Sequence, residues 1–321
     1  MVSKPILITS TLSAAPSHSR PVSAFSCLAV VSDYWALTKP EVNFLIVIAT
    51  LSGFYLGFPG PLMHFPWLLL VHTLLGTVLV ASGTSTLNQY FERRFDAKMR
   101  RTARRPLVTG RLAPSVVLLF GLAISAIGSI YLAIVVNLLA SLLSVATLLS
   151  YLFFYTPLKR KTPLCTLVGA FPGAMPPLIG LAASSGELGL QAWILFATLF
   201  LWQFPHFMAI AWMYREDYTR AGFCVLPRSA VRDRVVSLQT ILPLLALFPV
   251  ALLLAAAHQP STLYYAGAYL LNLGFFYFGA QFVLHRSNGA ARRLLVASII
   301  YLPLIFVLMS LLKKWSSGNS G

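Results

Sequence analysis

Charged residues divide the chain into long apolar stretches. Three stretches of about 50 residues contain no Asp, Glu, Lys or Arg, and they lie at 42–91, 112–158 and 235–285. Three shorter ones lie at 162–186, 188–214 and 294–312. A transmembrane helix needs about 20 apolar residues, and a charged side chain at mid-bilayer costs roughly 3 kcal/mol. Because each long stretch has room for two helices and each short one for a single helix, the pattern predicts an all-α membrane protein with nine transmembrane helices.

Turn-forming residues near the middle of each long stretch agree with this division. They are Phe58-Pro59-Gly60-Pro61 in the first stretch, the neighbourhood of Asn137 in the second, and His258-Gln259-Pro260 in the third. Pro, Gly and Asn favour turns and interrupt helices. We therefore expect a tight turn between two helices at each of these three places.

Both ends of the chain differ in composition from its centre. Residues 1–35 are rich in Ser, Ala and Pro, which predicts a disordered N-terminal tail, with a cleaved signal or transit peptide as the alternative. Residues 313–321 are predicted to be a flexible C-terminal tail. The nine-helix domain is therefore expected to span residues 36–312.

Composition and charge restrict the possible partners. Hydrophobic residues make up 58% of the chain and charged residues only 10%, a balance outside the range of soluble proteins. The formal net charge is +16, so most basic side chains must find anions in lipid head groups or in a phosphate ligand. The apolar content argues against nucleic acid. The three cysteines are widely spaced, which indicates neither a disulfide framework nor a zinc site.

The positions of the basic residues test the helix count independently. Segments 92–111, 159–161, 215–234 and 286–293 carry 8, 3, 5 and 3 Lys or Arg residues, which is 19 of the 24 in the chain. These segments follow the second, fourth, sixth and eighth predicted helices, and basic loops are retained on the cytoplasmic side. The N-terminus and the four basic loops are therefore predicted to be cytoplasmic, and the C-terminus to lie on the opposite side.

Three oxygen-bearing side chains recur every fourth residue at the end of the second predicted helix. Asn88, Glu92 and Asp96 would lie within about 80° on one helix face. Carboxylate and amide oxygens are suitable ligands for Mg²⁺, which often completes its coordination shell with substrate phosphate. Neutralisation of neighbouring arginines at the membrane surface is the alternative interpretation of the two acids.

Basic residues surround this predicted metal site. Arginine binds phosphate oxygens bidentately and lysine binds them as a point charge, so Mg²⁺ beside basic residues predicts a diphosphate ligand. The abundant aromatic residues (22 Phe, 13 Tyr and 6 Trp) suggest that a lipid chain forms the other end of that ligand. The candidate diphosphate-binding residues are Lys98, Arg100, Arg101, Arg104, Arg105, Lys159 and Arg160.

A second polar cluster follows the sixth predicted helix. It begins with Trp202, Gln203 and His206 and ends with Glu216 and Asp217. If one helix were continuous from His206 to Asp217, the two side chains would share a face, with the histidine about 16 Å deeper. A histidine bonded to a neighbouring helix in the core is the alternative for His206. The spacing of the two clusters suggests two related halves.

At these clusters the sequence resembles the UbiA superfamily of intramembrane prenyltransferases, and within it the branch that farnesylates heme b. The resemblance covers roughly residues 35–310, and several motifs in the right order carry it. They are Asn88 to Pro106, Tyr155 to Pro163, Gly169 to Pro177, Trp202 to Phe207, and Tyr214-Arg215-Glu216-Asp217-Tyr218 through Leu226-Pro227.

The resemblance implies a nine-helix bundle with an active site open to the cytoplasmic side. It implies that Asn88, Glu92 and Asp96 bind Mg²⁺-diphosphate and act in catalysis with Asp217. Many superfamily members have a second motif with acids four apart, whereas Tyr214 and Tyr218 stand at those places here. Glu216 and Asp217 lie between them and are the expected ligands of a second metal ion, and Tyr155, Trp202, Gln203 and His206 are the expected acceptor-binding residues.

The implied reaction joins farnesyl diphosphate to heme b. Neutralisation of the leaving diphosphate lets the allylic C–O bond ionise, and aromatic faces stabilise the resulting cation away from water. A heme vinyl group attacks the cation, and water then adds to give heme O. A bacterial inner membrane is the expected location, with a mitochondrial inner membrane as the alternative, and heme A synthase or terminal oxidase assembly would act downstream.

Two alternatives stay open at this point. A UbiA relative that prenylates a quinone precursor or another ring would share the fold and the diphosphate site. A secondary transporter could also have two similar halves, but it would require ionisable groups near mid-bilayer, where this sequence has almost none.

Overall fold

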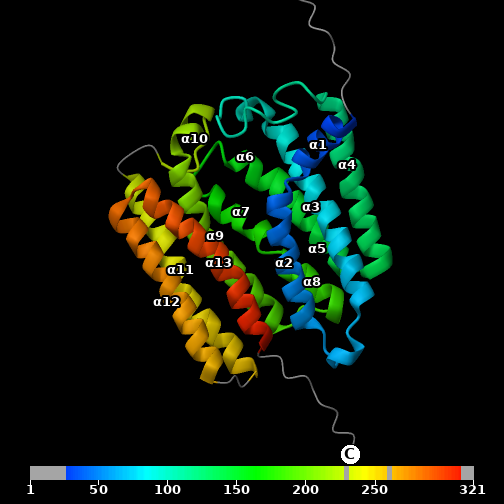
Figure 1. Ribbon diagram of the computed structural model, residues 1–321, viewed down its shortest axis with the longest axis vertical. Helices are drawn as coiled ribbons and strands as arrows, with labels where there is room; N and C mark the ends of the chain where they lie inside the picture. Colours follow the sequence, from blue (N-terminus) through cyan, green and yellow to red (C-terminus); the bar gives the residue numbers. More distant parts are fainter. Residues whose placement is uncertain (1–26, 228–230, 259–261, 312–321) are drawn as a thin grey trace, which may run out of the picture.

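The computed structural model describes residues 27–227, 231–258 and 262–311, and they form a bundle of helices (Figure 1). Nine spans within these residues are long and apolar enough to cross a membrane, which confirms the predicted all-α membrane fold. In chain order the helices are α1 (Cys27–Thr38), α2 (Pro40–Gly57), η1 (Leu62–His64), α3 (Trp67–Asp96), α4 (Pro114–Tyr131), η2 (Leu132–Val136), α5 (Leu138–Leu149), η3 (Ser150–Tyr155), α6 (Thr156–Leu158), α7 (Cys165–Gly173), α8 (Pro176–Ser185), α9 (Leu190–Met213), α10 (Arg215–Ala221), α11 (Val231–His258), α12 (Thr262–His285) and α13 (Asn288–Leu311).

Helices α7, α8 and α9 form the centre of the bundle. The α7–α8 span is 78% buried and the α9 span is 67% buried, whereas the seven outer spans are 22–44% buried. Large apolar side chains such as Phe44, Leu119 and Ile134 are exposed on the outer helices. Such extensive apolar exposure is expected where lipid replaces water around an integral membrane protein.

Helix α2 packs unusually closely against α8. A Cβ atom on Gly53 would lie 2.0 Å from the carbonyl oxygen of Pro177, and one on Gly180 would lie 1.9 Å from that of Thr50. Only glycine fits at both positions, because any side chain would overlap the backbone of the facing helix. This contact fixes the position of α2, whose N-terminal end leads into the polar site described below.

Several spans contain a local interruption of the α-helix. Asn137 separates η2 from α5, and its side chain accepts a hydrogen bond from the Ala140 amide at 2.8 Å, so the predicted turn at Asn137 is confirmed. The turn predicted at 58–61 is confirmed between α2 and η1, whereas residues 259 and 260 of the third predicted turn lie outside the described residues. Segments η2 and η3 are π-helical, a geometry that is frequent at functional sites.

The N-terminal boundary differs from the prediction. Residues 27–35, which we assigned to a disordered tail, are helical and belong to α1. The helix is tied to the bundle, because Asp33 pairs with Arg111 at 2.9 Å and the Tyr34 and Phe120 rings lie 4.8 Å apart. The composition of this segment does not indicate a helix, because α1 is short and depends on tertiary contacts. Residues 1–26 and the predicted tail 313–321 lie outside the described residues.

The basic connections share one end of the bundle. Figure 1 places the α3–α4 loop, α6, α10 and the α12–α13 turn at the upper end, together with α1. The α8–α9 connection, which carries Glu187, belongs to the opposite end. The alternation of basic and nearly uncharged connections therefore agrees with the arrangement of the helices.

Candidate active site

The first polar cluster lies where α3 ends, and its side chains are deeply buried. Asn88 is 1% exposed, Glu92 is 6% exposed and Asp96 is 3% exposed. Their spacing of four residues places them on the inward face of α3, as predicted. Burial at this level is costly for a carboxylate unless a partner neutralises it.

Each member of this cluster contacts a basic side chain from a different segment. Lys39 donates from its Nζ atom to Asn88 Oδ1 at 3.3 Å, and Lys159 Nζ lies 2.9 Å from Glu92 Oε1. Arg105 forms an ion pair with Asp96. The neutralisation interpretation of the two acids is therefore partly correct, although both pairs are largely buried and Lys159 comes from a distant segment.

A neutral residue completes the contacts of Asn88. Its Nδ2 atom donates to Thr156 Oγ1 at 3.2 Å, so α6 is joined to α3 at the same level as the ion pairs. Thr156 in turn donates to the carbonyl of Tyr151 at 2.9 Å. The amide oxygen of Asn88 is thus held toward Lys39 and the two acids.

The electrostatic environment differs between the two lysines. Burial first, and then the positive charges of Arg105 and Lys159, lower the pKa of the Lys39 amine from 10.5 to about 7. Burial also opposes the charge on Lys159, yet Glu92 and the tyrosines Tyr155 and Tyr151 outweigh it and raise the pKa of that amine well above its ordinary value. Lys159 is therefore a fixed counter-charge to Glu92, whereas Lys39 sits among competing cations.

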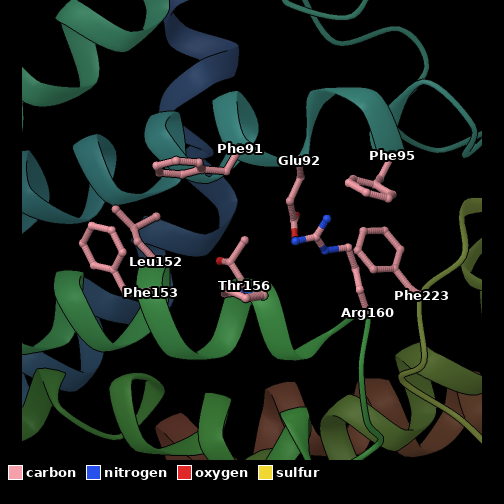
Figure 2. A pocket seen from close by; sticks show the side chains of 9 residues that line it. Phe91, Glu92, Phe95, Leu152, Phe153, Thr156, Arg160 and Phe223 are labelled. Carbon is pink, nitrogen blue, oxygen red and sulfur yellow. The ribbon is translucent and has the colours of Figure 1, made fainter.

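A pocket of about 150 Å³ adjoins the cluster (Figure 2). We call it the α3–α6 pocket, and its lining residues are Phe91, Glu92, Phe95, Leu152, Phe153, Thr156, Pro157, Arg160 and Phe223. Figure 2 shows Glu92 pointing into it from α3 and the guanidinium of Arg160 reaching toward Glu92 from the opposite wall. The other lining side chains are mainly aromatic, so the charged groups of Glu92 and Arg160 face an apolar surface.

A second, smaller pocket lies on the other side of Lys159. We call it the Tyr155 pocket, and it is lined by Tyr155, Lys159, Thr166, Phe207, Ile210, Ala211, Tyr218 and Val225. The Tyr151 and Tyr155 rings lie 5.0 Å apart, and Lys159 Nζ lies 4.5 Å from the centre of the Tyr155 ring. Tyr155 therefore lies beside the charged cluster, next to the phosphate-binding candidates, and its role in acceptor binding stays a prediction.

The seven predicted diphosphate-binding residues divide into two groups. Arg105 and Lys159 pair with the buried acids, and Arg160 lines the α3–α6 pocket. Lys98, Arg100, Arg101 and Arg104 are exposed on the loop that follows α3. Arg101 is nevertheless directed across the site entrance, because its guanidinium lies 5.0 Å from the centre of the Tyr214 ring.

The second polar cluster differs from the prediction in its local geometry. Helix α9 ends at Met213, and α10 begins at Arg215, because Tyr214 adopts φ −106° and ψ 19°. The continuous helix expected from His206 to Asp217 is therefore interrupted, so the shared face and the depth of about 16 Å, which both assume it, no longer follow. A helical break costs nothing at the membrane surface, where water can satisfy the freed carbonyls.

Of the two acids in the second cluster, only Asp217 is buried. Its Oδ1 atom lies 3.4 Å from Arg220, whereas Glu216 is exposed. The loop after α10 does reach the first cluster, because Phe223 lines the α3–α6 pocket and lies 5.6 Å from the Phe95 ring. Among the described residues no three His, Cys, Asp or Glu side chains gather as a metal-binding group, and the role of Glu216 and Asp217 as ligands of a second metal ion stays a prediction.

The predicted acceptor-binding residues of α9 use their polar atoms to hold helices together. His206 Nδ1 is 2.8 Å from Ser298 Oγ of α13, and Trp202 donates to the Ser298 carbonyl at 2.8 Å. Gln203 donates to the Ala170 carbonyl of α7 at 3.0 Å. These contacts favour the alternative that the sequence left open, in which His206 is a core histidine bonded to a neighbouring helix.

Sequence reasoning missed two residues of the first cluster. Lys39 belongs to none of the predicted binding sets, and Thr156 occurs only within the motif Tyr155 to Pro163. The signal for Lys39 is its position directly before Pro40, at the start of a span, where a charged side chain can turn back toward the membrane surface. No local pattern indicates Thr156, because its role depends on α6 meeting α3.

The donor atoms of the first cluster fit a magnesium ion. Asn88, Glu92 and Asp96 supply one amide oxygen and two carboxylates, the hard ligands that Mg²⁺ prefers, on a single helix face. The amine of Lys39, the amine of Lys159 and the guanidinium of Arg105 contact these oxygens and stand in for the positive charge that a metal would bring. Because these buried oxygens already contact positively charged side chains, Mg²⁺ can take the place of one of those side chains.

Comparison with known proteins identifies the class to which this fold and site belong. Residues 46–309 match the UbiA prenyltransferase family, and the chain belongs to that family. It is 48% identical over 285 residues to the protoheme IX farnesyltransferase of Solibacter usitatus (strain Ellin6076), an alignment that covers 87% of this chain and 98% of the relative. The predicted resemblance to the superfamily is confirmed.

Solved structures support the fold at lower sequence identity. A digeranylgeranylglyceryl phosphate synthase structure has a TM-score of 0.69 at 14% identity, and the match covers 88% of this chain and 97% of that one. A UbiA homologue from Archaeoglobus fulgidus, bound to GPP and Mg²⁺, has a TM-score of 0.58 at 16% identity, covering 87% and 99%. The arrangement of the helices in this chain is therefore similar to that of these structures.

Proposed function

We propose that the protein transfers the farnesyl group of farnesyl diphosphate to a vinyl group of heme b to give heme O. The observation that carries the proposal is the buried cluster of Asn88, Glu92 and Asp96, which opens on an aromatic pocket and is surrounded by cations. The near full-length similarity to a relative called protoheme IX farnesyltransferase selects heme b over a quinone ring. The confinement of charge to one end of the bundle supports an enzyme rather than a transporter.

The basic residues of the site hold the diphosphate in this proposal. Asn88, Glu92 and Asp96 would bind Mg²⁺, which supplies charge neutralisation to the leaving group. Arg105 and Lys159 are released from the acids and turn to the phosphate oxygens. Arg160 reaches the same place from the opposite wall, and the exposed residues Lys98, Arg100, Arg101 and Arg104 draw the anion to the entrance.

The aromatic walls act on the other end of the molecule. The α3–α6 pocket receives the first part of the farnesyl chain, and the faces of Phe91 and Phe95 stabilise positive charge as the allylic C–O bond breaks. The vinyl carbon of heme b forms the new C–C bond, diphosphate leaves, and addition of water completes the hydroxyethylfarnesyl group. Tyr155 would contact the acceptor from the Tyr155 pocket. Trp202, Gln203 and His206 would hold α9 in place through their contacts with neighbouring helices.

The setting of the reaction follows from the charge distribution. We place the basic end of the bundle in the cytoplasm and the protein in a bacterial inner membrane. Asp217 would assist at the cytoplasmic entrance through Arg220. The product, heme O, is apolar, so an enzyme of heme A synthesis or terminal oxidase assembly in the same membrane would receive it.

Incubation of the purified protein with heme b, farnesyl diphosphate and Mg²⁺ tests this proposal. Mass spectrometry should detect a heme that is heavier by one farnesyl group and one hydroxyl group. The same reaction with a quinone precursor in place of heme b should give no product. Prenylation of the quinone precursor, with heme b left unchanged, would overturn the choice of acceptor.

Substitution of a phenylalanine tests the place of the farnesyl chain. Phe153 lines the α3–α6 pocket, whereas its neighbour Phe154 does not, and both are 61% exposed. Phe153→Trp should overfill the pocket and raise the KM for farnesyl diphosphate about 10-fold, while Phe154→Trp should leave it unchanged. Steady-state kinetics with farnesyl and geranyl diphosphate measure the effect, which should be smaller for the shorter chain. If Phe153→Trp and Phe154→Trp changed the KM equally, the farnesyl chain would have to follow a different path.

A further inference from the structure

We propose that Lys39 is a further diphosphate-binding residue, which enters the site from the α1–α2 junction. The inference rests on the proposed function, because it assumes that a diphosphate occupies the cluster on α3. Lys39 is the last residue before α2, and its Nζ atom reaches Asn88 Oδ1 at 3.3 Å across 49 residues of sequence. It therefore contacts the predicted ligand set from the α1–α2 junction, whereas Lys159 follows α6 and Arg105 follows α3.

The balance of charges in the cluster favours an anion as its ligand. Three basic side chains, Lys39, Lys159 and Arg105, lie around two carboxylates, Glu92 and Asp96. Among the ion pairs of the described residues, Lys159 and Arg105 each have a carboxylate, whereas Lys39 has only the neutral amide of Asn88. A buried ammonium beside two other cations is unfavourable unless an anion joins them. A diphosphate supplies that charge, and binding of Mg²⁺ to the carboxylates would increase the demand for it.

The backbone at Lys39 indicates that its placement is specific. Its φ is 51° and its ψ is 67°, in the left-handed region that residues other than glycine, asparagine and aspartate rarely adopt. The neighbours hold this conformation, because Gln89 donates to the Leu37 carbonyl at 2.9 Å and Asn43 donates to the Thr38 carbonyl at 3.1 Å. Backbone strain of this kind tends to be retained where it serves a site.

Binding of inorganic pyrophosphate at saturating Mg²⁺ tests the proposal without an acceptor or a prenyl chain. Lys39→Asn removes the amine while keeping a residue that tolerates the left-handed backbone, and Lys39→Arg keeps the charge. Lys161→Asn is the matched control, since Lys161 is an exposed lysine in the adjacent loop. Calorimetry should show that Lys39→Asn weakens pyrophosphate binding about 10-fold or more, that Lys39→Arg largely restores it, and that Lys161→Asn leaves it unchanged.

Two further readouts separate binding from a structural role. If Lys39 only orients Asn88, Lys39→Asn will raise the Mg²⁺ concentration needed for half-maximal binding and leave pyrophosphate affinity at saturating Mg²⁺ unchanged, which would overturn the proposal. Heme affinity should be the same in all variants. A parent protein that binds pyrophosphate but farnesylates no heme would remove the heme assignment and leave the Lys39 proposal standing. A parent that binds no pyrophosphate would overturn both.

Discussion

Glu92→Gln is expected to lower kcat by about 100-fold or more while the protein still folds and inserts. The substitution keeps the size of the side chain and an oxygen that can accept from Lys159, but it removes the negative charge that magnesium needs. Asn88→Ala and Asp96→Ala should have effects of the same order, because the three oxygens belong to one face of α3. Heme farnesylation at saturating farnesyl diphosphate, assayed over a range of Mg²⁺ concentrations, measures the loss.

Asp233→Asn is a suitable control for Glu92→Gln. Asp233 pairs with Arg286 at the same end of the bundle, but it belongs to α11 and lines neither pocket. Its substitution should leave kcat within about twofold of the parent, because a partly exposed ion pair contributes little. Near-normal turnover in any two of the three cluster variants would mean that the acids only neutralise neighbouring basic residues.

Lys159→Met is expected to destabilise the protein and to inactivate it. The side chain of Lys159 is 13% exposed and that of Glu92 is 8% exposed, so loss of the lysine leaves a buried carboxylate unpaired. Breaking such a pair on one side costs about 3–5 kcal/mol of unfolding free energy. Turnover should also fall about 100-fold, because Lys159 is proposed to neutralise the leaving diphosphate.

A double variant separates these two effects. Adding Glu92→Gln to Lys159→Met removes the unpaired charge and should restore about 1–3 kcal/mol of stability without restoring turnover. Unfolding in detergent micelles gives the free energies, and the farnesylation assay gives the rates. If the double variant turned over as fast as Glu92→Gln alone, Lys159 would have only a structural role. Strictly additive unfolding free energies would contradict the buried pair.

The spans were predictable because lipid and water impose a strong pattern on the chain. Charge-free stretches gave all nine spans, since a charge inside any of them would be costly. Helix α1 was not predictable, because its twelve residues are short and held by partners such as Arg111 and Gln89, which are far away in the sequence. The family resemblance gave the membrane prenyltransferase class, which physical reasoning about composition alone does not reach.

The site was predictable only where its residues share one helix. Asn88, Glu92 and Asp96 follow from helical spacing, and the structure brings them together. The predicted shared face of His206 and Asp217 required one helix to continue past Tyr214. The backbone angles of Tyr214 interrupt that helix, so the prediction fails. The roles of Lys39 and Thr156 depend on how separate helices meet, and no periodicity within one segment contains that information.

The π-helical turn η3 changes which side of its span faces inward. A single added residue rotates everything beyond it by about 100° relative to a regular α-helix. Beyond η3, Thr156 and Lys159 point inward to the cluster on α3. Shortening η3 by one residue would therefore leave the span apolar and long enough to insert, yet it would turn its charged end away from Glu92 and toward the lipid.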